Sequence, residues 1–479
     1  MPRRVRGVGA RGDGIGKRAG HCARGGSGRI RRRVGVVRAK AVARPTGVTA
    51  RGWVRVVAVG GAGALVAGGL AGCSSSGSDV PAGTSFVVAA HAAAIPVDAA
   101  QRARATAGAS AFAVTLLRAL GAGGGDVTYS PQTLTDLLAM VMPGARGQTA
   151  AQLSAALGAD GLTAAQLAAA LGGDDATARA DAKQGSITLR ISSDVWAANT
   201  MTPSQAYLSV IDGAFGAGMH RADFADDPES ARDAVNEVVN HETDGYVPSL
   251  FGRGGITDQT RMVLTDALYL DAAWASPFDP QDTDQSGVFT RGDGSSETTA
   301  MMNQGGMFGY ASGSGWQLAE LPYQGGKLAM DVLLPASGSG TLAALRGKLT
   351  GASLASMLSA LQPTSLALTI PRFTADSSLD SLEQVLKGLG ITDLFDPGTA
   401  DLSGLSANKE SLYVSAVAAK AHIAVGEKGT VAAAAAGAAI TATSGRVTNV
   451  AFTVDHPFIY LIRDLTTGQI LFMGQESSI

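Results

Sequence analysis

The chain has 479 residues, of which 46% are hydrophobic and 16% charged, values typical of a globular protein large enough for one or two domains. The net charge of −2 hides a segregation: residues 1–72 contain 16 Lys and Arg against one acid, which leaves 22 basic and 39 acidic residues in the remainder. A body with a net charge of −17 is repelled by phosphate backbones, so nucleic-acid binding is excluded as an expected function. Both cysteines, Cys22 and Cys73, precede this body, and we expect no disulfide framework.

The first 72 residues carry the features of an export signal. Arg51 and Arg55 precede an apolar run of small residues, 56–70, which leads into Leu70-Ala71-Gly72-Cys73. These four residues resemble a bacterial lipobox, in which the cysteine thiol is acylated and becomes the new N-terminus. The alternative, a transmembrane helix, fits less well because the run is short and rich in glycine. We therefore expect an arginine-rich extension plus a lipoprotein signal peptide over 1–72. The exported protein is then anchored in the cell membrane through lipid on Cys73 and faces the extracellular side.

After the expected lipid anchor, residues 73–107 are rich in Ser, Gly and Ala and are predicted to form a tether. The body follows over 108–479. Helices appear mainly early and strands late, without regular alternation, which predicts an α+β fold with largely antiparallel sheets. The helical periodicities are at 111–120, 148–157, 230–243 and 379–389, and the strand-like runs are at 187–197, 262–270, 328–334, 365–370, 421–425 and 458–462.

Sequence motifs for catalysis are absent from the body. It contains no H-E-x-x-H, C-x-x-C, Walker or G-x-S-x-G motif. His220, His241 and His422 are single residues on ordinary segments, and Asp174-Asp175 is interpreted as a solvated turn. We therefore expect neither an enzyme nor a metal or cofactor site.

The most unusual segment is EKGTVAAAAAGAAITATS, residues 427–444, in which only the first two residues are charged. In a strand, every second residue from Thr430 would share one face, and all of these residues are small or apolar. Such a face suits insertion into a close-packed sheet, where each oversized side chain costs about 1–3 kcal/mol. On composition alone a helix or a low-complexity linker is preferred, because alanine is the best helix former. The alternating set comprises Thr430, Ala432, Ala434, Ala436, Ala438, Ile440 and Ala442.

The sequence around this segment changes that preference. EKGTVAAAAAG resembles the hinge of a serpin reactive-centre loop, and AFTVDHPFIYLIRDLTTGQILFMG, residues 451–474, resembles the serpin C-terminal signature. The resemblance covers about residues 109–479. Its other parts are Tyr129-Ser130-Pro131 with LLAMVMPGARGQTAAQL, residues 264–274 with Pro277-Phe278, LAELPYQGGKLAMDVLLP, IPRFTAD and LGITDLFDPGTADLSGLS.

The resemblance implies the serpin fold, with helices, three largely antiparallel β-sheets and an exposed reactive-centre loop at about 427–451. It also implies a protease inhibitor that acts as a suicide substrate. A target serine protease cleaves the loop and forms an acyl-enzyme; the cleaved loop then inserts into the central sheet and traps the protease. The alternative is a non-inhibitory serpin that serves as a surface binding or folding-assistance module.

The resemblance also assigns roles within the loop. Family spacing places the reactive bond between Thr443 and Ser444, which suits elastase- or subtilisin-like proteases. The rival bond, Arg446–Val447, would suit a trypsin-like protease. The expected partners are a target serine protease and the lipid membrane, and the protein is expected to be a monomer. The implied hinge comprises Glu427, Lys428, Gly429, Thr430, Val431, Ala432, Ala433, Ala434, Ala435 and Ala436.

Five further residues match the serpin breach and shutter, the regions that control opening of the central sheet. Trp274 matches the breach tryptophan, and Ser130 and Thr133 match shutter hydroxyl positions. The shutter asparagine of the family is Asp266 here, and its histidine is Ala419. Losing one partner of a buried hydrogen bond costs about 1–3 kcal/mol, whereas replacing both can be nearly neutral. We therefore expect a rewired shutter in which Asp266 needs another donor. The alternative is a sheet that opens less easily and a slow or non-inhibitory protein.

Overall fold

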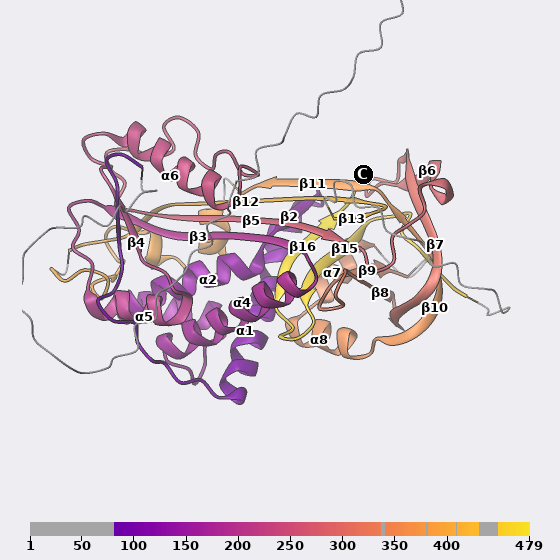
Figure 1. The fold of residues 1–479 in the computed structure, drawn as a ribbon, viewed down its shortest axis with the longest axis horizontal. Helices are drawn as coiled ribbons and strands as arrows, with labels where there is room; N and C mark the ends of the chain where they lie inside the picture. Colours follow the sequence, from indigo (N-terminus) through magenta and orange to yellow (C-terminus); the bar gives the residue numbers. More distant parts are fainter. Residues whose placement is uncertain (1–80, 337–340, 380–381, 409, 431–448) are drawn as a thin grey trace, which may run out of the picture. The chain divides into compact units, whose positions relative to one another are not determined.

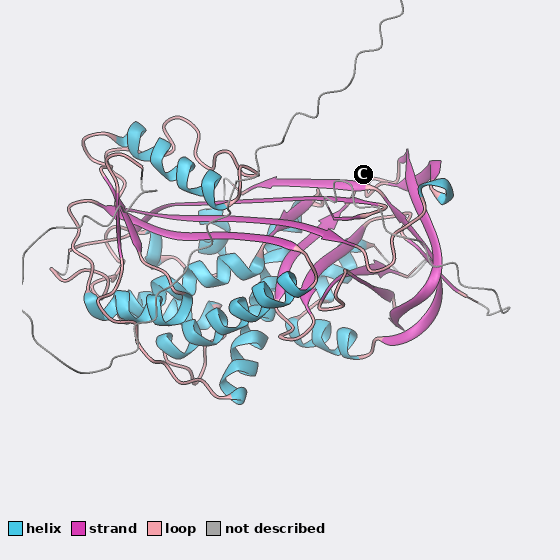
Figure 2. Cartoon of the chain, in the orientation of Figure 1, coloured by secondary structure: helices cyan, strands magenta, loops and turns pink. Residues whose placement is uncertain are grey.

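Two hydrogen-bonded sheets and a set of helices make up the part of the chain that the structure, a computed structural model, describes: residues 81–336, 341–379, 382–408, 410–430 and 449–479. The predicted α+β class is confirmed (Figure 2).

The first sheet has the strand order β1-β4-β3-β5-β13-β12-β11 (Figure 1). β3 and β5 pair antiparallel, whereas β5 pairs with β12, and β3 with β4, in parallel. Residues 262–270 of β5 are all buried, as expected for a central strand covered on both faces. The bounds are β1 Ser85–Val87, β3 Thr188–Ala198, β4 Met219–Ala222, β5 Met262–Ala273, β11 Phe373–Ser378, β12 Val414–Gly426 and β13 Gly429–Thr430.

The second sheet has the order β14-β10-β7-β8-β9-β15-β16-β2, with β6 paired to β7. β7 is 18 residues long and pairs with β10 along 301–310 and with β8 along 309–313. The resemblance predicted three sheets, but the described residues form two, because the long strand β7 pairs with β6, β8 and β10 and joins them in one sheet. The bounds are β2 Val127–Tyr129, β6 Asp284–Thr290, β7 Ser296–Gly313, β8 Trp316–Pro322, β9 Leu328–Pro335, β10 Gln362–Pro371, β14 Val450–Thr453, β15 Phe458–Asp464 and β16 Ile470–Glu476.

The helices cover both faces of the first sheet. α6 lies on one face, and α1, α2 and α4 lie on the other (Figure 1). Every residue of α2 is buried, so this helix is enclosed on all sides. The α-helices are α1 Ala99–Leu120, α2 Pro131–Val141, α3 Gly147–Ala156, α4 Ala164–Gln184, α5 Gln205–Phe215, α6 Pro228–Glu242, α7 Leu342–Lys348, α8 Gly351–Ser359 and α9 Leu382–Gly388. The 3₁₀ turns are η1 Gly121–Gly123, η2 Met142–Gly144, η3 Pro280–Asp282 and η4 Asp393–Phe395.

The alternation of side chains along β3 explains how one sheet supports two apolar cores. Val195 and Ala197 belong to the core shared with α1 and α2. Trp196, between them, points to the opposite face and packs with Val235 and Val239 of α6. A third core fills the space around the second sheet.

Most of the predicted elements coincide with observed ones, but two differ in instructive ways. α1 begins at Ala99, well before the predicted 111, because Asp98 and Gln101 form a capping box. The interpretation of Asp174-Asp175 as a solvated turn is wrong. Both residues are buried within α4, where Asp174 accepts a hydrogen bond from Thr106 Oγ1 of α1 at 2.8 Å.

Residues 81–98, which the sequence assigns to a tether, contact the first sheet and α5. β1 adds an edge strand that pairs antiparallel with β4. Further along, Ala93 N donates to Ser209 O of α5 at 2.8 Å. The predicted tether of 73–107 thus includes an edge strand and the beginning of α1.

Candidate functional site

The candidate site lies along the β5–β12 seam, which we define as the facing edges of residues 262–273 and 414–426. At one end the two strands pair directly, from Met262 opposite Val414 to Leu268 opposite Ala421. At the other end β13 lies between them and pairs antiparallel with both. Thr430, the first residue of the predicted inserting face, is therefore already part of the sheet.

Gly429 has the one backbone conformation at this site that requires glycine. Its φ is +153°, and a Cβ atom there would lie 2.0 Å from Ala272 O and 2.7 Å from Ala273 Cα. No side chain fits at these distances. The two-residue turn at 427–428 can therefore return the chain between the strands only because residue 429 lacks a side chain.

Trp274 fixes the turn through two hydrogen bonds. Its backbone N donates to Lys428 O, and its Nε1 donates to Gly426 O, each at 2.9 Å. The indole stacks on the ring of Tyr323 with 4.6 Å between centroids. Tyr323 Oη lies 2.6 Å from Thr430 Oγ1, so this aromatic pair also contacts β13 directly.

The charged residue that begins the hinge is fastened by partners from two other elements. The Glu427 carboxylate accepts hydrogen bonds from Thr283 Oγ1 and Arg372 Nε, both at 2.8 Å, and forms an ion pair with Arg372. Burial raises the pKa of Glu427, but the Arg372 and Thr283 hydrogen bonds outweigh it and the pKa is lowered overall. Glu427 therefore stays ionised and anchors the turn at neutral pH.

The predicted shutter residues meet at the directly paired end of the seam. Asp266 of β5 lies opposite Ala419 of β12. Ser130 caps α2 beneath them, its Oγ accepting from Thr133 N at 3.2 Å. Burial raises the pKa of Asp266 to about 8, and the neighbouring Thr133 side chain lowers it only in part. The Thr133 hydroxyl donates to Ser130 O at 3.3 Å, so a separate donor for Asp266 stays a prediction. Among the described residues, Asp266 Oδ1 has no hydrogen-bond partner.

Comparison with known proteins gives this arrangement a family. The family model described as Serpin (serine protease inhibitor) matches residues 107–479. The chain belongs to the serpin family. Iripin-2 of Ixodes ricinus is 32% identical over 370 residues, which cover 77% of this chain and 92% of that protein. Leukocyte elastase inhibitor A of Mus musculus is 32% identical over 376 residues, which cover 77% of this chain and 97% of that inhibitor.

Solved structures agree with the fold. The native state of tengpin, a thermophilic serpin, matches with a TM-score of 0.73 and 24% identity over 82% of this chain and 98% of tengpin. Native protease nexin-1 with heparin matches with a TM-score of 0.68 and 28% identity over 79% of this chain and 100% of that protein. Family membership supports serine protease inhibition, rather than catalysis, as the function of the chain.

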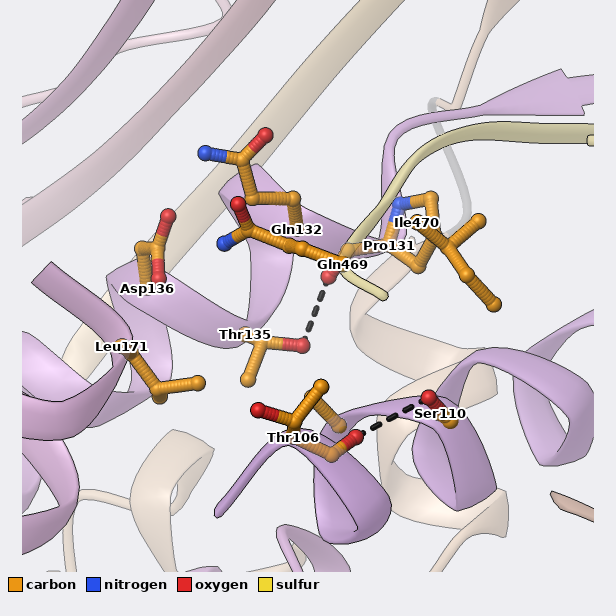
Figure 3. Close-up of a pocket in the computed structure, with 10 residues that line it drawn as sticks. Thr106, Ser110, Pro131, Gln132, Thr135, Asp136, Leu171, Gln469 and Ile470 are labelled. Atoms are coloured by element: carbon orange, nitrogen blue, oxygen red, sulfur yellow. Dashed lines mark hydrogen bonds between the residues drawn. The ribbon is translucent and has the colours of Figure 1, made fainter. Parts of the chain in front are cut away.

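In this serpin, the buried Asp136 of α2 lines a small cavity (Figure 3), and the buried Asp175 of α4 interacts with it. Asp175 Oδ1 accepts a hydrogen bond from Gln469 Nε2 at 2.8 Å and another from Gln132. Burial first, and then the charge of Asp175, raises the pKa of Asp136 well above its ordinary value. Asp266 adds to this effect, so Asp136 lies between two other carboxyl groups that both raise its pKa. The residues that line the cavity include Thr106, Ser110, Thr135, Asp136, Leu171 and Gln469.

The sequence did not reveal several residues of this serpin site. Tyr323, Arg372 and Thr283 contact the hinge from positions far from it in the chain. The LPY and IPRFTAD motifs, which contain Tyr323 and Arg372, were part of the family resemblance and were the available signals, whereas no motif contained Thr283. The predicted residues that lie outside the described part of the chain are Cys73, Val431, Ala432, Ala433, Ala434, Ala435, Ala436, Thr443, Ser444, Arg446 and Val447.

Proposed function

We propose that this serpin inhibits a serine protease by inserting its cleaved loop into the β5–β12 seam. The observation that carries the proposal is β13, in which the first two residues beyond the turn already pair with both flanking strands. In an inserted strand, the face that begins at Thr430 would carry Ala432, Ala434 and Ala436, whose small side chains suit a close-packed sheet.

Insertion along the rest of the seam has a favourable balance of hydrogen bonds. The direct β5–β12 pairing, one ladder, would be replaced by two ladders, one on each side of the new strand. Each net hydrogen bond contributes about 0.5–1.5 kcal/mol, so a strand of about a dozen residues would release roughly 10 kcal/mol. Opening the seam must first separate the pairs around Asp266 and Ala419.

Incubation with a panel of proteases tests this mechanism. The expected result is a covalent complex that survives boiling in SDS. Ala434→Arg should abolish the complex and turn the protein into a substrate, because the inserting face would carry a buried charge. Ala433→Arg is the matched control, because its side chain would point to the opposite face, and it should keep most of the inhibition. Cleavage without any stable complex would contradict the proposal and favour the non-inhibitory alternative.

We propose Thr443–Ser444 as the reactive bond, with an elastase- or subtilisin-like protease as the target. The support is the family spacing from Glu427, together with the small residues that precede the bond. Mass spectrometry should show that the released C-terminal fragment starts at Ser444. A fragment that starts at Val447 would instead show that cleavage follows Arg446 and would indicate a trypsin-like target.

We further propose that the protein is an exported monomer anchored outside the cell membrane through lipid on Cys73. The support is the resemblance of Leu70-Ala71-Gly72-Cys73 to a lipobox after an apolar run. A bacterial host grown with labelled palmitate should label the wild type and bring it into the membrane fraction. Cys73→Ser should remove both the label and the membrane association. Light scattering of the detergent-solubilised protein should give the mass of one chain.

A further inference from the structure

A second polar cluster lies on the opposite face of the first sheet, where the end of α6 meets β3 and β4. Asp194 is on β3, His220 is on β4 and Glu242 is the last residue of α6. Each residue offers one ligand atom, and these atoms all lie within 4.8 Å of one another. The fold brings the three together from positions that are more than 20 residues apart in the sequence.

The strand register explains why the imidazole and the first carboxylate converge. Trp196 of β3 lies opposite His220 of β4, and Asp194 precedes Trp196 by two residues on the same face. His220 Nε2 is 3.5 Å from Asp194 Oδ1. This distance exceeds that of an ordinary N–H···O hydrogen bond. It is close to the separation of about 3.4 Å between two ligand atoms on one tetrahedral zinc ion, given metal–ligand distances of about 2.1 Å.

The donor groups are held in position by their neighbours. The His220 ring stacks on Trp196 with 4.3 Å between centroids, and Phe86 of β1 packs near it at 4.5 Å. Ser192 Oγ donates to Asp194 Oδ2 at 3.1 Å, which leaves Oδ1 facing His220. The His220 side chain is 9% exposed, and its Nδ1 has no hydrogen-bond partner among the described residues.

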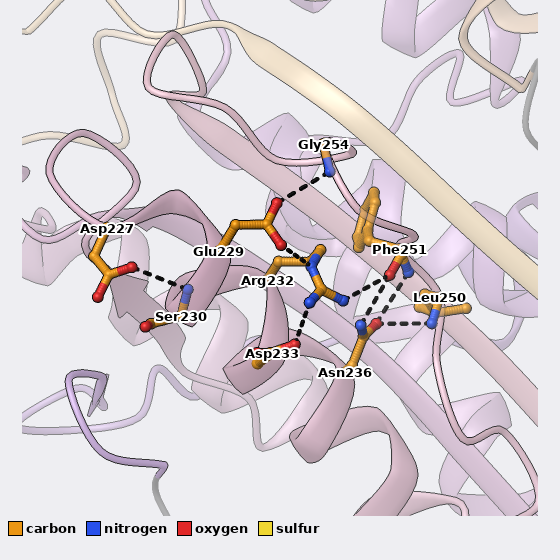
Figure 4. Close-up of polar contacts among 9 residues, drawn as sticks. All are labelled: Asp227, Glu229, Ser230, Arg232, Asp233, Asn236, Leu250, Phe251 and Gly254. Carbon is orange, nitrogen blue, oxygen red and sulfur yellow. Dashed lines mark hydrogen bonds and ion pairs between the residues drawn. The ribbon is translucent and has the colours of Figure 1, made fainter.

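Polar contacts fix α6, the helix that ends at Glu242, to the segment that follows it (Figure 4). Asn236 Oδ1 accepts from Leu250 N at 2.8 Å, and its Nδ2 donates to Phe251 O at 2.9 Å. Nearer the start of the helix, Glu229 accepts from Gly254 N at 3.0 Å. These contacts fasten the helix at two points before its last turn, so the position of Glu242 is set by the packing of α6.

A divalent ion at this position would be coordinated by both carboxylates and would use the imidazole as a neutral ligand.

We propose that Asp194, His220 and Glu242 bind one divalent transition metal ion of the zinc class. One imidazole and two carboxylates are a donor set that zinc accepts, with water in the remaining position. The sequence predicted no metal site because these residues form no spacing motif. The ion would fasten the end of α6 to β3 and β4, so binding should also raise the temperature of unfolding.

Titration calorimetry with zinc chloride on purified, tag-free protein tests the site. The wild type should show one zinc-binding component. His220→Ala should lack this component or show an affinity for zinc at least about 100-fold lower, since even the outer partners of metal ligands change metal affinity 10–100-fold. Glu242→Gln, which preserves the shape of the side chain, should weaken binding in the same way if His220→Ala fails to fold. His422→Ala is the matched control, because His422 forms an exposed pair with Asp376 and lies on β12.

The thermal readout adds a second criterion. Zinc should raise the unfolding temperature of the wild type and of His422→Ala, but not of His220→Ala or Glu242→Gln. Zinc isotherms that are the same for the wild type and both site variants would overturn the proposal, and so would a wild type that binds no zinc. These measurements record binding and stability only, so their outcome is independent of whether the serpin inhibits a protease.

Discussion

At the Trp274 end of the β5–β12 seam the strands are separated by β13, whereas at the Asp266 end they pair directly with each other. The Trp274 end is fixed by well-partnered groups: the indole, the Tyr323 hydroxyl and the Glu427 carboxylate all have hydrogen-bond partners at 2.6–2.9 Å. The Asp266 end covers a buried carboxyl group with one unpartnered oxygen. The proposed insertion would thus begin where the polar groups have hydrogen-bond partners and would then pass a region where one carboxyl oxygen has none.

This difference suggests how the two ends divide the control of opening. Polar contacts at the Trp274 end hold β13 between β5 and β12, where the proposed insertion would start. Separation of the strands at the Asp266 end would expose carboxyl groups that are more stable in water, and this would lower the cost of opening. The rewired shutter at the Asp266–Ala419 pair stays a prediction.

The largest expected effect comes from the pH dependence of the Asp266 end. The pKa of Asp266 is raised from its ordinary value to about 8 in the folded protein, so the folded state binds this proton more tightly than the unfolded chain does. The stabilisation is complete below about pH 4 and is lost as the pH rises towards 8, a change of up to about 5 kcal/mol. Asp266→Asn should remove this loss, which denaturant unfolding at pH 4–8 would measure.

Asp258→Asn is the control for that measurement, because Asp258 is exposed near the start of the same strand. It should leave the pH profile unchanged. Other buried carboxyl groups, such as Asp136, still contribute to the profile of the Asp266→Asn protein. If the wild type and Asp266→Asn lose the same free energy of unfolding between pH 4 and 8, ionisation of Asp266 does not destabilise the folded protein.

The next largest effect is expected at the Trp274 end, from Gly429→Ala. The new Cβ would lie 2.0 Å from Ala272 O, so β13 must leave the sheet or shift. We expect the free energy of unfolding to fall by about 3 kcal/mol. Gly426→Ala is the matched control, because no atom lies within 4 Å of a Cβ there, and it should cost less than about 1 kcal/mol. Equal free energies of unfolding for the two variants would show that β13 does not pair between β5 and β12.

The two ends also differ in how far the sequence could predict them. The hinge is a continuous motif, so the family resemblance could assign roles to Glu427, Gly429 and Thr430. Neither the pairing of β13 nor the partners of Glu427 could be predicted, because Thr283 and Arg372 lie in the connections that precede β6 and β11. Their contribution depends on tertiary packing.

At the Asp266 end the sequence named Asp266 and Ala419 as departures from the family, but not the neighbouring acids. Asp174 and Asp175 were wrongly placed in a turn, because paired acids between apolar stretches are usually solvated. α4 buries them because Thr106, Gln132 and Gln469 supply donors from three other segments. α2 has no polar face for periodicity analysis to detect, because the whole helix is buried.

The smallest expected effect isolates one contact at the Trp274 end, the hydrogen bond between Tyr323 Oη and Thr430 Oγ1. Tyr323→Phe and Thr430→Val each leave a buried hydroxyl unpartnered, whereas the double variant leaves none. A double-mutant cycle should therefore give a coupling energy of about 1 kcal/mol. Combining Thr430→Val with Tyr310→Phe is the control and should give no coupling, because Tyr310 bonds to Gln317 on β8 instead. A coupling near zero for the Tyr323 pair would mean that β13 is seated by its backbone pairing and by Trp274 alone.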